Sequence, residues 1–224
     1  CYSPMRYVWD RFDDYFGPER MGRVGSGGLR VMAGRLRAWD VATAPRVHQF
    51  VANSQTVADR IRNFYGRDST VIEPPVDTDF FTPGEDDPAS PDPDYDLVVS
   101  ALVPYKRIDL AIDAANLTGR RLLVVGSGPE ESRLRARAGA SVEFLGHADR
   151  DRLLGLYRGC RALVLPGVED FGIVVAEALA CGRPAVVNAK GGGAEIVNRG
   201  EFGQTFTGFS GAAVAEALRQ LVPS

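Results

Sequence analysis

Residue types that build metal centres and nucleophilic triads are scarce in this sequence. Its 224 residues include three cysteines (Cys1, Cys160 and Cys181) and two histidines (His48 and His147) that lie far apart. An odd number of cysteines at this spacing fits neither a disulfide framework nor a zinc site, and it favours a reducing, cytoplasmic location. No pattern in the sequence indicates a Ser/His/Asp triad or a His-rich metal centre.

The sequence also has few lysines, no excess of basic over acidic residues and no long apolar runs. Lys106 and Lys190 are the only lysines, and the formal net charge is -3. This balance argues against a nucleic-acid-binding surface. No stretch is long and apolar enough to cross a membrane. The composition is that of an ordinary globular protein, and the chain is long enough for one large or two small hydrophobic cores.

The most informative stretch joins an apolar strand to an apolar helix. Residues 162–165 predict a buried strand, which Pro166 ends because proline cannot continue the hydrogen-bond ladder. Residues 173–181 predict a helix that is apolar on nearly every face and stops at Gly182. Glu177 is the exception, and a buried carboxylate is costly unless groups donate hydrogen bonds to it. An arginine, backbone amides or the hydroxyls of a ligand would meet that need.

The turn before this helix adds a second indication of a ligand. The first amides of a helix suit a phosphate, and in open parallel sheets ligands bind at the carboxyl ends of strands. The segment therefore offers an anion site together with two carboxylates, Glu169 and Glu177, with seven residues between them. A blander interpretation stays open on the residues alone: Glu169 is a solvated loop acid, and Glu177 pairs with an arginine of the core.

Several linked motifs of this segment resemble one enzyme family. They are Glu169-x7-Glu177, the Phe171-Gly172 pair, the run from Ala180 to Pro184, and Glu195. Together they are similar to the donor-site signature of the retaining glycosyltransferases of family 4, also called glycosyl transferases group 1. The resemblance implies a GT-B fold, in which two Rossmann-like domains face each other across a cleft.

The resemblance also implies roles for the acidic residues and the turn. Glu169 would orient the donor sugar, and Glu177 would accept hydrogen bonds from the ribose hydroxyls. The backbone amides of Phe171, Gly172 and Ile173 would bind the diphosphate. The carboxylates also allow a glycosidase, which needs two of them about 5–9.5 Å apart across one glycosidic bond.

Two cations follow the first predicted strand of the second half. Lys106 and Arg107 stand before a predicted helix, where positive charge opposes the helix dipole unless an anion is bound. Similar transferases use a lysine here to neutralise the leaving nucleotide diphosphate, and Lys106 matches it. They often carry an arginine shortly before, where this chain has Ala101, and whether Arg107 replaces it is open. A surface role for Lys106 is the alternative.

Further donor-side candidates come from a glycine turn. Gly126 and Gly128 follow the second predicted strand, but a third glycine and a downstream ribose-binding acid are missing, so the dinucleotide fingerprint is weak. The resemblance places this turn beside the donor. The three successive glycines from Gly191 to Gly193 allow a close approach of the backbone to another group.

The first residues resemble the acceptor side of the same family. CYSPMRYVWD is similar to a segment written His-Ser/Thr-Pro-Met-Arg-Tyr-x-Trp-Asp, with Tyr2 in place of the histidine. Arg6 is a candidate for binding a phosphate or acidic group of the acceptor, because its fork matches such oxygens. An arginine held between aromatic rings for structural reasons is the alternative.

The chain is predicted to hold parts of two domains. We expect a partial N-terminal, acceptor-side domain over 1–76, an acidic and proline-rich linker over 77–96, and a C-terminal donor-binding domain over 97–224 that is itself truncated. In the last part, strands are predicted at residues 97–102, 122–125, 142–145, 162–165 and 185–187. Helical patterns between them predict an α/β fold with a doubly wound parallel sheet.

Residues 25–28, with their three glycines, predict a flexible joint before a basic helix that ends near Asp40. The arginines Arg30, Arg35 and Arg37 give this helix a positively charged surface. A solvated face is the default, and contact with an anionic membrane is the sharper alternative.

These observations predict a retaining transferase that moves a sugar from a nucleotide-diphosphate sugar to a hydroxyl of a glycan or lipid-linked acceptor. Residues 1–10 and 101–110 are most similar to bacterial mannosyltransferases of polysaccharide assembly, so GDP-mannose is the favoured donor. The resemblance implies no cofactor and no essential metal, and we expect no nucleic-acid partner. The expected location is the cytoplasm or the inner face of the cytoplasmic membrane. A UDP-sugar-dependent enzyme of the same fold and a non-catalytic nucleotide-sugar-binding module are the alternatives.

Overall fold

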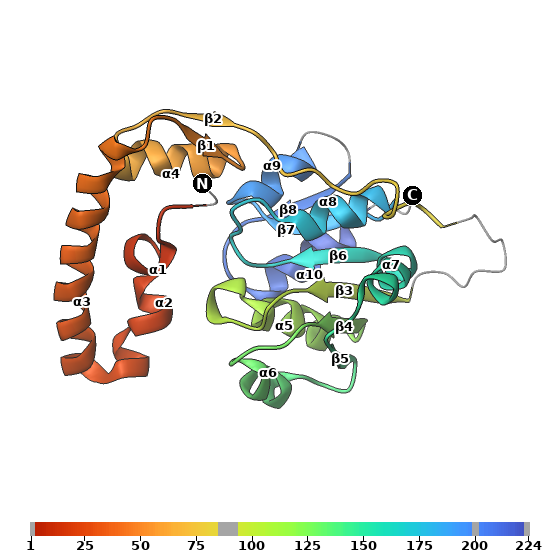
Figure 1. Ribbon diagram of the computed structural model, residues 1–224. Helices are drawn as coiled ribbons and strands as arrows, with labels where there is room; N and C mark the ends of the chain where they lie inside the picture. Colours follow the sequence, from red (N-terminus) through yellow and green to blue (C-terminus); the bar gives the residue numbers. More distant parts are fainter. Residues whose placement is uncertain (1–2, 85–93, 199–201, 222–224) are drawn as a thin grey trace. The chain divides into compact units, whose positions relative to one another are not determined.

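The computed structural model describes residues 3–84, 94–198 and 202–221, which form two compact units, Cys1–Pro74 and Pro75–Ser224 (Figure 1). The linker was predicted over 77–96, and the boundaries predicted for both of its ends are wrong. Its middle, 85–93, lies outside the described residues. Phe81 is buried against Tyr157, with ring centroids 5.8 Å apart, so the start of the supposed linker belongs to the core of the second unit. At the other end, a strand already begins at Tyr95.

The first unit is mainly helical. It contains α1 (Arg6–Trp9), α2 (Phe12–Phe16), α3 (Pro18–Thr43), η1 (Ala44–Arg46), β1 (Phe50–Ala52), α4 (Gln55–Tyr65) and β2 (Ser69–Val71). Strands β1 and β2 pair in parallel. The hydroxyl of Ser54 caps α4 by accepting a 3.1 Å hydrogen bond from the Val57 amide, and Gly66 ends α4 with a positive φ of 62°.

The joint predicted at residues 25–28 was wrong, because those residues lie inside α3. The break is at Gly22, which adopts φ 69° and ψ 165° between two helical segments. Glycine reaches this conformation without steric cost, whereas helical glycines only weaken a helix by about 1 kcal/mol each. Within this run Ser26 is buried, whereas Gly25, Gly27 and Gly28 are exposed.

The prediction of a purely solvated basic face on this helix also needs correction. The Arg37 Nε donates a 2.7 Å hydrogen bond to the carbonyl of Val8, and its guanidinium lies 5.7 Å from the Trp9 ring. Arg30 pairs with Asp13. These arginines therefore tie α3 to α1 and α2 in addition to carrying charge.

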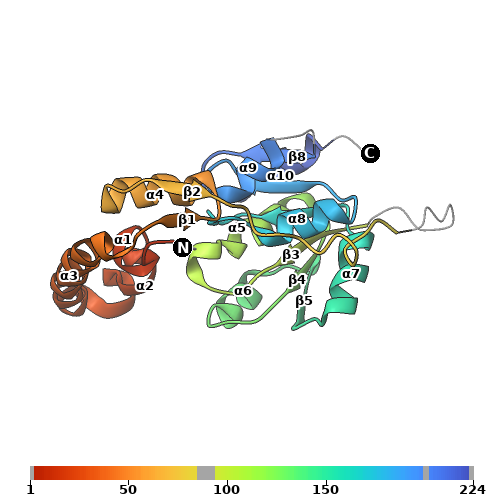
Figure 2. The same cartoon turned by 45° about the horizontal axis from the view of Figure 1, so that its top comes forward.

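The second unit is a parallel sheet covered by helices on both faces, as the two views show (Figures 1 and 2). Its strands are β3 (Tyr95–Val99), β4 (Arg121–Val125), β5 (Val142–Gly146), β6 (Ala162–Leu165), β7 (Ala185–Asn188) and β8 (Gly203–Phe206). Its helices are η2 (Pro104–Lys106), α5 (Ile108–Thr118), α6 (Glu131–Arg137), α7 (Arg150–Gly159), α8 (Ile173–Ala180), α9 (Gly192–Asn198) and α10 (Gly211–Arg219).

Alternating strand residues supply two separate cores. In β3, Val98 joins the cluster under α5, α6 and α10, while its neighbour Leu97 joins the cluster under α7, α8 and α9. The same alternation holds for Val164 and Leu163 in β6. A strand buried on both faces needs apolar residues at every position, which is why these strands were readable as continuous apolar runs.

The five strands predicted in this unit and the doubly wound parallel sheet are confirmed. β8 was missed, because Gly203, Gln204 and Thr205 carry little apolar signal. A Cβ on Gly203 would lie only 2.1 Å from the carbonyl oxygen of Ala185, so this edge strand pairs closely with β7.

The strand order β5-β4-β3-β6-β7-β8 reverses direction between β3 and β6. In sheets of this kind, the crevice outside the carboxyl ends of the two strands at the reversal is the place where ligands bind. The loops after β3 and β6 are therefore the first place to look for a site.

Hydrogen bonds from Arg161 connect three parts of this unit. Its guanidinium donates to both oxygens of the buried Asp96 in β3, at 2.9 and 3.0 Å, and to the carbonyl of Leu218 in α10 at 2.9 Å. Removing one partner of a buried pair costs roughly 3–5 kcal/mol. Here Arg120 remains 3.7 Å from Asp96, so we expect Arg161→Met to lower the free energy of unfolding by less, about 2 kcal/mol.

Urea denaturation near neutral pH measures this loss. The matched control is Arg219→Gln, which removes an exposed pair with Glu216 and should change stability by less than about 0.5 kcal/mol. Equal effects of the two variants would show that the Asp96 pair is no more important than a surface contact.

Candidate functional site

Lys106 and Glu169 meet at the reversal point of the sheet. Lys106 ends the short helix η2 after β3, and Glu169 lies in the loop between β6 and α8. The Lys106 Nζ is 2.7 Å from Glu169 Oε2, and the two side chains are 18% and 11% exposed. The structure thus brings together the two residues that were predicted to be catalytic. Glu169 is not a solvated loop acid and Lys106 is not a surface lysine, so neither alternative interpretation holds.

The second oxygen of Glu169 has no hydrogen-bond partner in the described part of the chain. Oε1 is buried, while Oε2 holds the lysine. Leaving a buried acceptor unsatisfied costs about 1–3 kcal/mol, and more for a charged group. A hydroxyl of a bound molecule would remove this cost, which makes Glu169 a binding group as well as an ion-pair partner.

Glycines let the loops at this edge touch backbone to backbone. A Cβ on Gly167 would lie 2.7 Å from the carbonyl oxygen of Tyr105, beside Lys106. Gly191 has a φ of 98°, and its Cβ would lie 2.5 Å from the carbonyl oxygen of Glu169. The Gly192 amide donates a 2.9 Å hydrogen bond to that same oxygen. The close approach predicted for these glycines is therefore made to the loop of Glu169.

Gly126 and Gly128 support the other side of the Lys106 loop. A Cβ on Gly126, which has a φ of 122°, would lie 1.9 Å from the carbonyl oxygen of Ser100, and one on Gly128 would lie 2.5 Å from that of Leu102. Packing against the β3–α5 loop fully explains why these residues are glycines. Their predicted contact with the donor stays a prediction.

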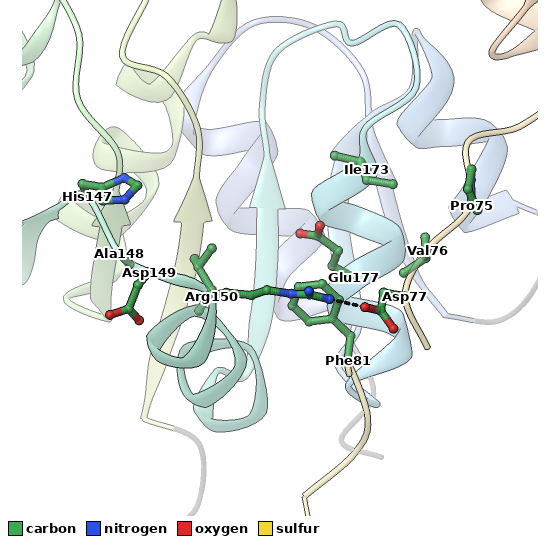
Figure 3. Close-up of a pocket in the computed structure, with 11 residues that line it drawn as sticks. Pro75, Val76, Asp77, Phe81, His147, Ala148, Asp149, Arg150, Ile173 and Glu177 are labelled. Carbon is green, nitrogen blue, oxygen red and sulfur yellow. Dashed lines mark hydrogen bonds and ion pairs between the residues drawn. The ribbon is translucent and has the colours of Figure 1, made fainter. Parts of the chain in front are cut away.

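A pocket of about 430 Å³ opens beside α8 (Figure 3). The residues that line it come from the start of the second unit, the β5–α7 region and α8: Pro75, Val76, Asp77, Phe81, His147, Ala148, Asp149, Arg150, Leu153, Ile173 and Glu177. Arg150 pairs with Asp77 and stacks on Phe80, 4.0 Å from the ring centroid. Ile173 and Glu177, the first and fifth residues of α8, face this pocket, and Phe171 and Gly172 lie just before them.

Among the described residues, one side chain donates a hydrogen bond to Glu177. The Tyr157 hydroxyl donates to Glu177 Oε2 at 2.8 Å, so the partner is a tyrosine and not the arginine of the blander interpretation. Burial raises the pKa of Glu177, and the hydrogen bond from Tyr157 and the charge of Arg150 offset part of that rise. Burial and the neighbouring Glu177 also raise the pKa of Tyr157, which keeps it protonated as a donor.

The sequence was then compared with known proteins. The family model described as "Glycosyl transferases group 1" matches residues 85–223. The chain belongs to this family. Two curated relatives are the D-inositol 3-phosphate glycosyltransferases of Mycolicibacterium smegmatis, 33% identical over 166 residues, and of Rhodococcus opacus, 34% identical over 203 residues. The first match covers 64% of this chain and 38% of the relative, and the second covers 78% and 45%.

Two solved structures share the fold of this chain. Anabaena HepE in complex with UDP superposes with a TM-score of 0.71 at 24% identity, over 82% of this chain and 56% of that one. Sucrose-phosphate synthase from Thermosynechococcus elongatus gives a TM-score of 0.72 at 24% identity, over 86% and 52%. The predicted GT-B type of fold is thereby confirmed. The chain spans less than half the length of the curated relatives named above.

Two arginines that were also predicted as site residues have acidic neighbours in this group 1 chain. Arg107, with a φ of 50°, donates hydrogen bonds of 3.0 and 2.9 Å to Asp109 and lies 5.3 Å from the Phe209 ring. Its guanidinium is thus engaged on residues outside the pocket, and its role at the donor stays a prediction. Arg6 belongs to the first unit, where its Nε is 4.0 Å from Asp10.

Sequence reasoning missed two polar groups. Tyr157 looks like an ordinary helix residue, and only the packing of α7 on α8 shows that it serves Glu177. Asn188 ends β7 with its Nδ2 buried and without a hydrogen-bond partner among the described residues. A polar residue closing an apolar strand was the one available signal for Asn188.

Proposed function

We propose that this chain carries the donor-binding part of a retaining glycosyltransferase, which moves a sugar from a nucleoside-diphosphate sugar to a hydroxyl of a glycan or lipid-linked acceptor. The observation that carries the proposal is the buried Lys106–Glu169 pair at the reversal point of the sheet, with Glu169 Oε1 left unsatisfied. Membership of the group 1 family supports it.

The donor would extend from the pocket to the ion pair. Its ribose hydroxyls would donate to Glu177, which lines the pocket and has one hydrogen-bond donor, Tyr157, in the part of the chain that the structure describes. The diphosphate would lie at the start of α8, where the amides after Phe171 and Gly172 and the helix dipole favour an anion. The sugar would then reach Glu169 Oε1, with Lys106 between the sugar and the diphosphate.

Catalysis would follow the charges that develop as the glycosidic bond breaks. Negative charge grows on the diphosphate, where Lys106 and the amides of the α8 turn stabilise it. Positive charge grows on the sugar ring, which the carboxylate of Glu169 favours. Because a lysine fills the neutralising role, we propose that transfer needs no metal, so chelators should leave the rate unchanged.

The arrangement argues against a glycosidase. Such an enzyme points two carboxylates at one bond. Here Glu169 binds Lys106, whereas Glu177 binds Tyr157 and faces the pocket.

GDP-mannose is the first donor to test, because residues 1–10 and 101–110 resemble segments of bacterial mannosyltransferases. The curated relatives are named for D-inositol 3-phosphate, so this compound is a second acceptor to test beside glycans and lipid-linked glycans. UDP-sugars are the competing donors of the same fold.

Calorimetric titration of this chain with GDP-mannose, UDP-glucose, GDP and UDP tests the donor site. We expect one nucleotide family to bind and the other to bind at least tenfold more weakly, with the preferred base identifying the donor. Transfer is measured on the complete gene product, because the relatives are about twice as long as this chain. Donor binding without transfer or hydrolysis there would indicate a binding module instead of an enzyme. No binding to either protein would refute the donor site.

A further inference from the structure

The long helix α3 has an apolar face that the other described residues leave exposed. Its inward side is a narrow stripe containing the buried Ser26 and Ala33, which packs against α1 and α2 along one side of α3 (Figure 1). The exposed apolar residues of α3 are Met21 (48%), Val24 (91%), Val31 (60%), Met32 (56%), Leu36 (41%), Trp39 (60%) and Val41 (39%). An apolar surface of this kind marks a contact site.

The helical repeat places most of these residues together. Val24, Val31 and Trp39 are seven and eight residues apart, which is two turns of helix each time, so they share the face opposite the buried stripe. Met32 and Leu36 continue this face toward an apolar groove of about 130 Å³ that they line with residues of α1 and α2. We call Val24, Val31, Met32, Leu36 and Trp39 together the α3 face.

Positive charge accompanies this face. The α3 sequence contains five arginines and two acidic residues, Glu19 and Asp40, so its formal charge is +3 (five minus two) in a chain whose net charge is -3. Arg23 and Arg35 are exposed. Whole-chain charge would repel an anionic surface, whereas this one helix would attract it.

We propose that the α3 face docks on the surface of an anionic lipid bilayer, with Trp39 and the valines inserted at the headgroup boundary and the arginines on the lipid phosphates. Helices that combine exposed aromatic and aliphatic residues with arginines lie in the interface in this way. Each basic side chain near an anionic membrane strengthens binding about fivefold. No helix of the described residues is long and apolar enough to span a bilayer. The proposal does not depend on the donor site.

Vesicle sedimentation tests this proposal. We expect the chain to sediment with phosphatidylcholine vesicles that contain about one third phosphatidylglycerol, and not with phosphatidylcholine alone. Binding should weaken as salt is raised. Arg23→Gln with Arg35→Gln should weaken it by about 25-fold. The matched control is Arg62→Gln with Arg152→Gln, which changes the net charge equally on exposed residues outside α3 and should have little effect.

Trp39 gives an independent readout, because the chain has two tryptophans and the other, Trp9, is stacked on Phe64 at 4.6 Å. Vesicles should shift tryptophan emission to the blue in the wild type. Trp39→Phe should abolish the shift while keeping sedimentation. The variant with Val24, Val31 and Trp39 all changed to serine should lose both the emission shift and the sedimentation. Its circular dichroism spectrum should be unchanged, since these side chains are exposed.

Several results would overturn the proposal. They are equal binding to neutral and anionic vesicles, equal loss in the two pairs of arginine variants, and an emission shift that survives in Trp39→Phe. Binding by this chain but not by the complete gene product would show that other protein covers the α3 face. Association of the chain with itself that disappears in the serine variant would assign the face to a protein contact.

Discussion

Replacing Lys106 by glutamine is expected to reduce sugar transfer by roughly 10²–10³-fold with little change in donor affinity. Lys106 is held at the reversal point of the sheet, 2.7 Å from Glu169, and its charge is placed where negative charge grows as the diphosphate leaves. An interaction that strengthens only in the transition state affects the rate more than binding. The measurement is kcat and KM of the complete gene product, with the preferred nucleotide sugar found by calorimetry.

Controls separate this catalytic effect from damage to the fold. Lys106→Gln leaves the buried Glu169 without its cation, so stability should fall. Adding Glu169→Gln should restore stability, because the uncompensated charge is gone, but should not restore transfer. Lys106→Arg keeps the charge and should retain more activity than Lys106→Gln. A rate within tenfold of wild type in Lys106→Gln would show that this lysine does not neutralise the leaving group.

Replacing Glu177 by alanine is expected to weaken nucleoside-diphosphate binding by about 10- to 100-fold, because hydrogen bonds to a charged group contribute about 1.5–3 kcal/mol. Glu177 faces the pocket, and of the residues that the structure describes only Tyr157 donates a hydrogen bond to it. Nucleotides that lack the ribose hydroxyls provide the matched comparison. These nucleotides should bind wild type more weakly than the parent nucleotide does. The Glu177→Ala variant should bind both kinds of nucleotide equally. An unchanged preference in the variant would place the ribose elsewhere.

The raised pKa of Glu177 predicts that the free energy of unfolding depends on pH. Burial raises the pKa of Glu177 above its ordinary value of 4.5, so the folded chain holds this proton more tightly than the unfolded chain does. Ionising Glu177 therefore lowers stability as pH rises from that value through the raised pKa. Glu177→Gln, which still accepts from Tyr157, should raise the free energy of unfolding near pH 7 and change it little near pH 4. Urea denaturation at both pH values measures the difference.

Much of the second unit was predictable, because its strands are buried on both faces and are apolar at nearly every position. The need of Glu177 for a partner was equally visible, since a carboxylate in an apolar helix is costly. The identity of that partner was not, because Tyr157 comes from another helix and its spacing to Glu177 carries no signal.

Other features depended on contacts that no local pattern records. Three glycines in four residues look like a joint, yet 25–28 are helical and the break falls at an isolated Gly22. Arg107 follows Lys106 directly, but Asp109 two residues later holds its guanidinium. Charge and sequence position were therefore insufficient to assign Arg107 to the site.

The contacts of Gly167 and Gly191 have a consequence for engineering. At Gly167 and Gly191 the loops after β3, β6 and β7 approach one another backbone to backbone, so a side chain added at either glycine would push two loops apart. Attempts to change the donor should therefore leave this glycine framework intact. Diversity belongs at the rim of the pocket, at residues such as His147 and Ile173, whose side chains can be exchanged without moving the backbone that carries Lys106 and Glu169.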